Sequence, residues 1–168
     1  DINLIKNIIA FLVFIPAFIN LNSTTELKNI FILIISGIIG IGLGDTFYLK
    51  SLQKIGTRKT LSVETLSPLM AALSGEILIN ENLTPKSWIG IIIVSVSLFI
   101  VLKNRNDFKE GNSAVSEKNN FKIYVFPFLS VLCAVLGGLF SRIVFLQSNL
   151  SPFFTTEIRL LGAIIFLL

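Results

Sequence analysis

The sequence predicts an all-α protein, a polytopic bundle of helices that cross a lipid bilayer. Hydrophobic residues make up 53% of the 168 residues and charged residues only 14%, which is about half the charged share of a soluble domain. The charges lie in short clusters and leave uncharged stretches of nearly membrane-spanning length. Because lipid offers no partner to backbone N–H and C=O groups, these stretches are expected to be helices rather than open strands.

The uncharged stretches give the predicted elements in order. They are Asn7 to Thr25, Asn29 to Gly44, Ser87 to Leu102 and Ile123 to Ser141. A shorter stretch, Thr65 to Gly75, reaches Ile79 if Glu76 is tolerated, and a last one begins at Leu160. We therefore expect helices at residues 4–21, 29–49, 60–79, 86–103, 122–147 and from 157 onward.

Turn-forming residues separate these helices. Gly56 with Thr57 marks one turn, and Thr84 before Pro85 is a favourable helix start, a capping hydroxyl followed by a proline. Residues 104–121 are rich in Asn, Ser, Gly and mixed charge, which predicts a polar linker. The chain opens on Asp1 and closes within an apolar run, so we expect it to be a piece of a longer protein.

Small residues recur at helical spacing in two of the expected helices. Ser36, Gly40 and Gly44 share one helix face, as do Ser67, Ala71 and Gly75. Small side chains let membrane helices approach closely, so both rows predict packing contacts. The single cysteine, Cys133, lies in an apolar run and is expected to serve packing.

One segment carries a specific family resemblance. It runs from Gly44 to Glu81 and is followed by LTPKSWIGIIIVSVSLFIV. The motif elements are Tyr48, Leu52 to Gly56, Ser67-Pro68, Glu81, Leu83-Thr84 and Trp88 to Gly90. This pattern resembles the EamA-type domain of the drug/metabolite transporter superfamily. Gly137 through Arg142, Ser151-Pro152 and Arg159 are similar to the start of another such repeat, so the resemblance covers nearly the whole chain.

The resemblance implies a ten-helix transporter built from two inverted repeats. Residues 1–103 would hold helices two to five of the first repeat, and residues 122–168 the truncated start of the second. A faint similarity of residues 1–5 to residues 157–161 fits this division. The resemblance also assigns structural roles to the motif residues Gly44, Gly56, Glu81 and Gly90.

Membrane orientation is left open by the sequence. Basic residues gather in the loop around residues 50–59 and in the linker, whereas the opposite loops hold only Lys28 and Lys86. The positive-inside rule places the basic side in the cytoplasm. The family resemblance implies the reverse, because both termini of such transporters are usually cytoplasmic.

Asp45 and Glu64 are the sharpest candidates for chemistry. Each lies five residues from a basic residue at a helix end, Lys50 and Lys59, so a helical hairpin would hold both about 7 Å below the basic layer. A carboxylate inside a bilayer marks a substrate or proton path by default. The alternative is that both lie near the interface and pair with Lys50, Arg58 or Lys59.

Further candidates for the substrate or proton path are Tyr48, Ser67, Pro68, Arg142 and Arg159. Pro68 frees a backbone carbonyl in mid-helix, which either lines a cavity or makes a packing kink. The two arginines would either bind an anionic substrate or anchor their helices at the interface.

A secondary transporter of a small metabolite, working by alternating access with possible proton coupling, accounts best for these features. The expected partners are the lipid bilayer and an unknown small-molecule substrate, in a multi-pass protein of the plasma or inner membrane. The chain has no histidine and no carboxylate cluster, so we expect no enzyme activity, metal or cofactor. Its basic residues are dispersed, so nucleic acid is not expected. A membrane scaffold without transport activity is the other alternative.

Overall fold

The computed structural model describes residues 2–15, 26–104, 124–148 and 150–168. Within these ranges every regular element is a helix, which confirms the all-α class. The chain divides into two compact units. Unit 1 contains Asp1–Thr46 and Cys133–Leu168, and unit 2 contains Phe47–Leu132. Most of the predicted 104–121 linker, and the ends of the predicted helices at 16–21 and 122–123, lie outside the described residues.

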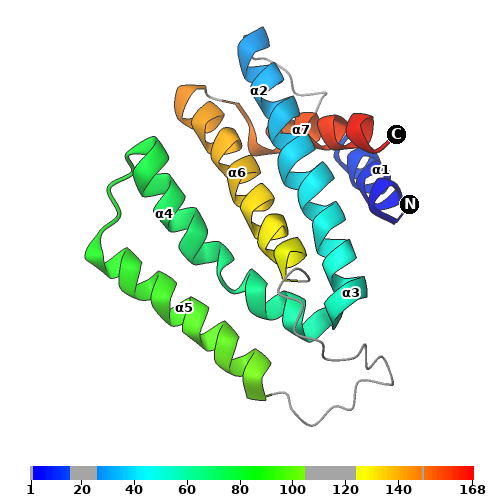
Figure 1. Cartoon of the computed structure of the whole chain (residues 1–168). Helices are drawn as coiled ribbons and strands as arrows, with labels where there is room; N and C mark the ends of the chain where they lie inside the picture. Colours follow the sequence, from blue (N-terminus) through cyan, green and yellow to red (C-terminus); the bar gives the residue numbers. More distant parts are fainter. Residues whose placement is uncertain (1, 16–25, 105–123, 149) are drawn as a thin grey trace. The chain divides into compact units, whose positions relative to one another are not determined.

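Unit 1 is a helical bundle formed by segments from both ends of the chain. Its helices are α1 (Ile2–Phe14), α2 (Leu27–Gly37), the π-helix η2 (Ile38–Leu43) and α7 (Pro152–Leu167), together with most of α6 (Val125–Gln147). Helix α7 packs against α1, α2 and η2 (Figure 1). Residues more than a hundred positions apart in the sequence therefore share one core.

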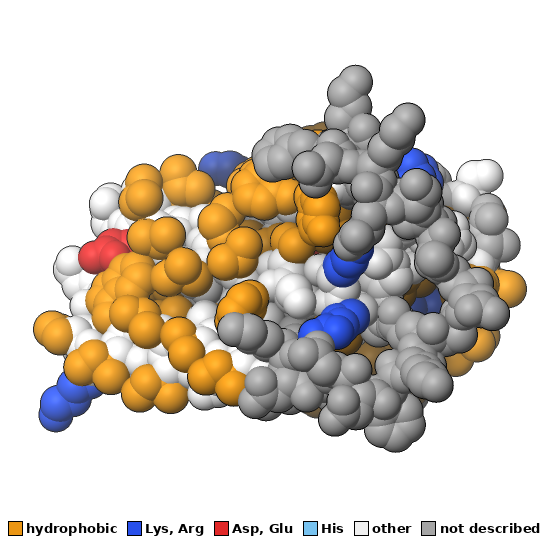
Figure 2. All heavy atoms as spheres, turned by 60° about the horizontal axis from the view of Figure 1, so that its bottom comes forward, with side chains coloured by type: hydrophobic (Ala, Val, Ile, Leu, Met, Phe, Trp, Pro, Cys, Tyr) orange, Lys and Arg blue, Asp and Glu red, His pale blue; other side chains and the backbone are white. Residues whose placement is uncertain are grey.

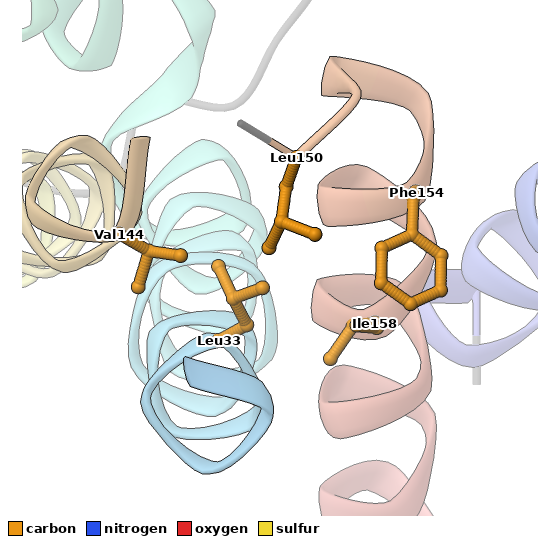
Figure 3. Close-up of a cluster of buried hydrophobic side chains, with 5 residues drawn as sticks. All are labelled: Leu33, Val144, Leu150, Phe154 and Ile158. Atoms are coloured by element: carbon orange, nitrogen blue, oxygen red, sulfur yellow. The ribbon is translucent and has the colours of Figure 1, made fainter. Parts of the chain in front are cut away.

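The core of unit 1 is a cluster of aliphatic and aromatic side chains. Leu33 of α2, Val144 of α6 and Leu150 point toward Phe154 and Ile158 on successive turns of α7 (Figure 3). Leu33 and Val144 are completely buried. The spacing of four between Phe154 and Ile158 puts both on the same helix face, which explains how one stripe of α7 contacts the other helices.

Helix α7 begins five residues earlier than the predicted start at residue 157. Ser151 has an extended backbone, and its Oγ accepts a hydrogen bond from the Phe154 N–H at 3.2 Å. Pro152 follows as the first helical residue, where its missing N–H is not needed. The predicted start at 157 left Ser151 and Pro152 outside the helix, although together they form a standard helix start.

The predicted helix at 29–49 is present as a continuous helical run through α2, η2 and the start of α3 (Gly44–Glu64). Its middle, η2, is wound more loosely than an α-helix. A π-helical turn inside α-helix is rare and is often found at functional sites.

The row of small residues along this run makes the predicted close contact. Ser36 Oγ donates a hydrogen bond of 2.7 Å to the Gly137 carbonyl of α6. A Cβ added at Gly137 would lie 2.5 Å from the Gly40 Cα, so these two backbones touch. A Cβ at Gly44 would lie 3.6 Å from the Cys133 Cβ, which confirms packing roles for Gly44 and Cys133.

In unit 2 the turn predicted at Gly56 is confirmed. Gly56 has φ 81° and ψ 165°, and this non-helical residue separates two arms of α3. The arms are held together by a hydrogen bond of 2.7 Å between the buried hydroxyls of Ser51 and Thr60. Thr60 Oγ1 also donates to the Gly56 carbonyl at 2.9 Å, which ties the turn to the second arm.

The single helix predicted at 60–79 is wrong in its middle, because regular α-helix stops at Thr65 and Leu66, where the Leu66 N–H bonds to the Val63 carbonyl in a tighter turn. Helix α4 (Ser67–Ile79) begins directly after this break, with Pro68 in its first turn. Proline has no N–H to bond back to the preceding turn and disfavours helix in the residue before it. At the position of the kink expected from Pro68, the regular helix is therefore interrupted by a two-residue turn.

Helix α4 ends at Asn80, which adopts the left-handed conformation that commonly closes helices. The Glu81 N–H then donates to the Gly75 carbonyl at 3.2 Å, and a Cβ at Gly75 would lie 3.4 Å from Glu81 Oε2. The neighbour of Gly75 is thus the motif residue Glu81. The row of Ser67, Ala71 and Gly75 was predicted to contact another helix. At Gly75 the neighbouring atom is instead Glu81 Oε2.

Helix α5 (Pro85–Asn104) confirms the prediction at 86–103 to within one residue. Thr84 Oγ1 accepts a hydrogen bond from the Ser87 N–H at 3.3 Å, as expected of a capping hydroxyl before Pro85. Helices α4 and α5 pack against one another (Figure 1).

Two described helical runs are long and apolar enough to cross a membrane, Leu27–Glu64 and Val125–Gln147. Ile2–Phe14, Ser67–Ile79 and Pro85–Ile100 are apolar but shorter. The six spans predicted are thus not all reproduced, because the break before Pro68 shortens α4 and polar residues interrupt the apolar run of α7. Many large apolar side chains are exposed, and Figure 2 shows a face on which they outnumber charged ones.

Candidate functional site

A row of hydrogen-bonded polar side chains lies along α1 in unit 1. Asn3 and Asn7 are both buried, and Asn7 Nδ2 donates to Asn3 Oδ1 at 3.2 Å. Asn3 Nδ2 donates in turn to Thr46 Oγ1 at 3.2 Å. The i, i+4 spacing of the two asparagines places them on one helix face. Sequence reasoning did not select them, although this spacing was a readable signal.

The row reaches the backbone of η2. Thr46 Oγ1 donates to the Gly42 carbonyl at 2.6 Å, and Asn3 Nδ2 lies 3.5 Å from the same oxygen. Buried polar groups are expensive without partners, so these bonds are what allow the asparagines to lie inside an apolar bundle. They also tie α1 to the π-helical segment.

Asp45 closes the row with an ion pair to Lys6 of α1. Sequence reasoning offered Lys50, Arg58 or Lys59 as its partner, and the structure gives Lys6 instead. Local spacing could not find this partner because it lies on a helix far away in the sequence. Both side chains are partly exposed, 34% for Asp45 and 54% for Lys6. We call Asn3, Lys6, Asn7, Asp45 and Thr46 the α1 polar row.

Glu64 belongs to unit 2, where it accepts a hydrogen bond of 3.1 Å from Ser130 Oγ of α6. Ser130 is buried, and its position as a lone hydroxyl in an apolar run was the signal that sequence reasoning did not use. Because Asp45 lies in unit 1, the equal depth expected for the two carboxylates stays a prediction.

Three further candidates also belong to unit 2. Tyr48 is half-buried in the first arm of α3. Ser67 and Pro68 are half-buried in the first turn of α4, next to the helix break. Their roles in a substrate path stay predictions.

The two candidate arginines have different environments within unit 1. Arg142 is exposed on α6. Arg159 is half-buried on α7, with one guanidinium nitrogen 3.3 Å from where a Cβ would stand at Gly40. Its Nε is buried and has no hydrogen-bond partner among the described residues. Arg159 therefore lies at the helix contact built by Gly40 and Gly137, whereas Arg142 is on the surface.

Glu157, two residues before Arg159, was not selected by sequence reasoning. Its side chain is completely buried. The signal was present, because a single acidic residue stands in the apolar sequence of α7. It was noted only within the faint similarity of residues 157–161 to residues 1–5.

The motif glycines differ in what surrounds them. Gly44 packs at the α6 contact and Gly56 makes the turn with positive φ. A Cβ at Gly90 would meet no described atom within 4 Å. The structure thus gives a physical reason for glycine at Gly56, whereas a Cβ at Gly44 would make ordinary contacts at 3.6 Å and one at Gly90 would make none.

The described helices expose many large apolar side chains and bury hydrogen-bonded polar ones, an arrangement typical of helical membrane proteins. The model of the EamA-like transporter family matches residues 1–103. The chain belongs to this family, which confirms the resemblance seen in its motifs. No curated protein and no solved structure gives a significant match.

Proposed function

We propose that this protein is a secondary transporter, a multi-pass protein of the plasma or inner membrane that moves a small metabolite by alternating access. Membership of the EamA-like transporter family supports a transport function. Substrate class, direction and coupling are not given by the family match.

The observation that carries the proposal is the α1 polar row. It links α1, η2 and the start of α3 through side chains that an apolar bundle has no structural need to contain. Polar groups at membrane depth are costly, and they commonly mark the route of a solute or ion. The row ends in a charged pair that is partly exposed at the surface of unit 1, which is where such a route would begin.

Within the proposal, Asp45 has the most direct role. Its carboxylate is held by Lys6 from another helix, so a movement of α1 relative to α3 would break or remake the pair. Tyr48, Glu64, Ser67, Pro68, Arg142 and Arg159 are the further residues that we assign to the substrate or proton path.

The experiment uses the complete natural protein in proteoliposomes and measures counterflow of radiolabelled amino acids, nucleosides and sugars. We expect at least one compound to exchange, and we expect Asp45→Asn to lower its initial rate severalfold. Glu76→Gln is the matched control, because Glu76 is an exposed carboxylate on α4 and should leave the rate unchanged.

The double variant Lys6→Met, Asp45→Asn separates transport from simple ion pairing. If Asp45→Asn is slow only because it leaves the Lys6 charge without its partner, removing both charges should restore the rate. If Asp45 takes part in transport, the double variant stays slow. Absence of exchange for every compound in the wild-type protein would contradict the proposed function and favour a scaffold.

A further inference from the structure

Glu157 is the least expected side chain in unit 1. It is completely buried in the second turn of α7, the helix that packs against α1, α2 and η2. Neither carboxyl oxygen has a hydrogen-bond partner among the described residues. A buried carboxyl group almost always has such partners, so this one requires an explanation.

Among the described residues no cation forms an ion pair with Glu157. Arg159 lies two residues further along α7, and side chains at i and i+2 do not face each other. Lys6 of α1 is already paired with Asp45. Lys28 of α2 and Arg142 of α6 are exposed, and the η2 sequence IIGIGL has no charged residue.

An isolated carboxylate in such surroundings is strongly disfavoured relative to the neutral acid. The neutral acid carries an O–H, which needs only a single acceptor. The other buried oxygen without a partner among the described residues of unit 1 is Asn7 Oδ1, on the packed helix α1. Unit 1 thus contains Asn7 Oδ1, an acceptor without a hydrogen-bond donor among the described residues, and Glu157, which can donate an O–H when it is protonated.

The α1–α7 contact is consistent with this complementarity. The rings of Phe14 and Phe153 lie 6.1 Å apart. Asn7 is about two turns before Phe14 on α1, and Glu157 is about one turn after Phe153 on α7. The first turn of α1 and the last turn of α7 lie at the same end of the pair (Figure 1). Measured from the contact between Phe14 and Phe153, Asn7 and Glu157 therefore both lie toward this end of the helix pair.

We propose that Glu157 is a proton-binding site, which rests on the proposed function and identifies the coupling ion as H⁺. While α7 is packed against its neighbours, Glu157 carries the proton as a carboxylic acid. When the helices separate and water enters, the O–H bond breaks, the bonding electrons stay on the carboxylate, and a water molecule accepts the proton. Reprotonation on the other side of the membrane resets the site.

Infrared difference spectroscopy tests the proton directly on the complete natural protein in lipid, without a substrate. We expect a carboxylic acid C=O band at neutral pH that disappears at alkaline pH. Glu157→Gln should lack this band, and Glu76→Gln should retain it. Glu157→Asp keeps the acid and should shift the band, which provides the assignment if the glutamine variant aggregates.

A neutral-pH spectrum without a Glu157 band would overturn the proposal, even if counterflow is observed. Counterflow also separates this inference from the proposed function. In the wild-type protein a pH gradient should drive accumulation of the exchanged compound, and Glu157→Gln should lose accumulation but keep exchange. Accumulation that survives in Glu157→Gln would also overturn it. A Glu157 band without exchange of any compound would support the proton-binding site and contradict the proposed transport function.

Discussion

Gly56 shows how one residue determines a turn between two helical arms. Its backbone, at φ 81° and ψ 165°, occupies a region that side chains with a Cβ rarely adopt. The Ser51–Thr60 hydrogen bond then closes the turn from both arms. Gly90 shares the family motif but has ordinary helical surroundings with no described atom within 4 Å of a Cβ.

This contrast makes a residue-scale prediction. Gly56→Ala should lower the free energy of unfolding by about 1–3 kcal/mol, because alanine is strained in this conformation. Gly90→Ala should leave it unchanged or raise it by about 0.5–1 kcal/mol, because alanine is the better helix former. Thermal unfolding in detergent micelles checks both variants. Equal effects at the two positions would mean that the turn does not need glycine.

At the scale of the helices, α2 and η2 approach α6 closely enough for their backbones to touch. Gly137 lies against Gly40 and the Ser36 carbonyl, and Ser36 Oγ bonds back to Gly137. Close backbone approach of this kind is a main source of association between membrane helices. Gly138, the next residue, is exposed, and a Cβ there would meet no described atom within 4 Å.

The two neighbouring glycines form a matched pair for an element-scale prediction. Gly137→Ala places a methyl group into the Gly40 backbone and should destabilise the protein by about 1–3 kcal/mol. Gly138→Ala adds the same methyl group facing outward and should have little effect. The difference in melting temperature between the purified variants measures the contact. A larger loss in the Gly138 variant would contradict the packing of α6 described above.

Across the described residues, the chain exposes more large apolar side chains than soluble proteins usually leave open to water. Ile2 and Ile77 are more than 70% exposed, and α5 shows isoleucine, valine and phenylalanine on most of its surface. An exposed apolar surface of this extent must be covered by something other than water. Lipid acyl chains provide it for a membrane protein of this family.

At this scale we predict behaviour in fractionation. The complete natural protein should stay in the membrane pellet after alkaline carbonate treatment and enter solution only with detergent, because its apolar helices lie in the bilayer. Immunoblotting of pellet and supernatant provides the measurement. A peripheral membrane protein treated in parallel should be released, and release of this protein as well would contradict membrane integration.

The sequence predicted the features that depend on local pattern. Apolar runs gave the helices, Gly56 and Thr84-Pro85 gave two boundaries, and the Ser36 row gave a helix contact. It failed where the partner is distant in the sequence. Lys6 and Ser130 could not be assigned to Asp45 and Glu64 by spacing alone. Glu157 was missed because its burial is a property of the folded bundle.

The π-helical segment η2 has a consequence for the register of the chain. A π-helical turn contains one residue more than the α-helix needs for the same path, so it is equivalent to a single-residue insertion. Deleting one residue between Ile38 and Leu43 would allow regular α-helix to form without opening the backbone. If the extra residue were instead wound as regular α-helix, everything after it would rotate by about 100°, carrying Asp45 and Thr46 away from α1. The looser winding of this short segment thus sets which side of the following helix faces Asn3 and Lys6.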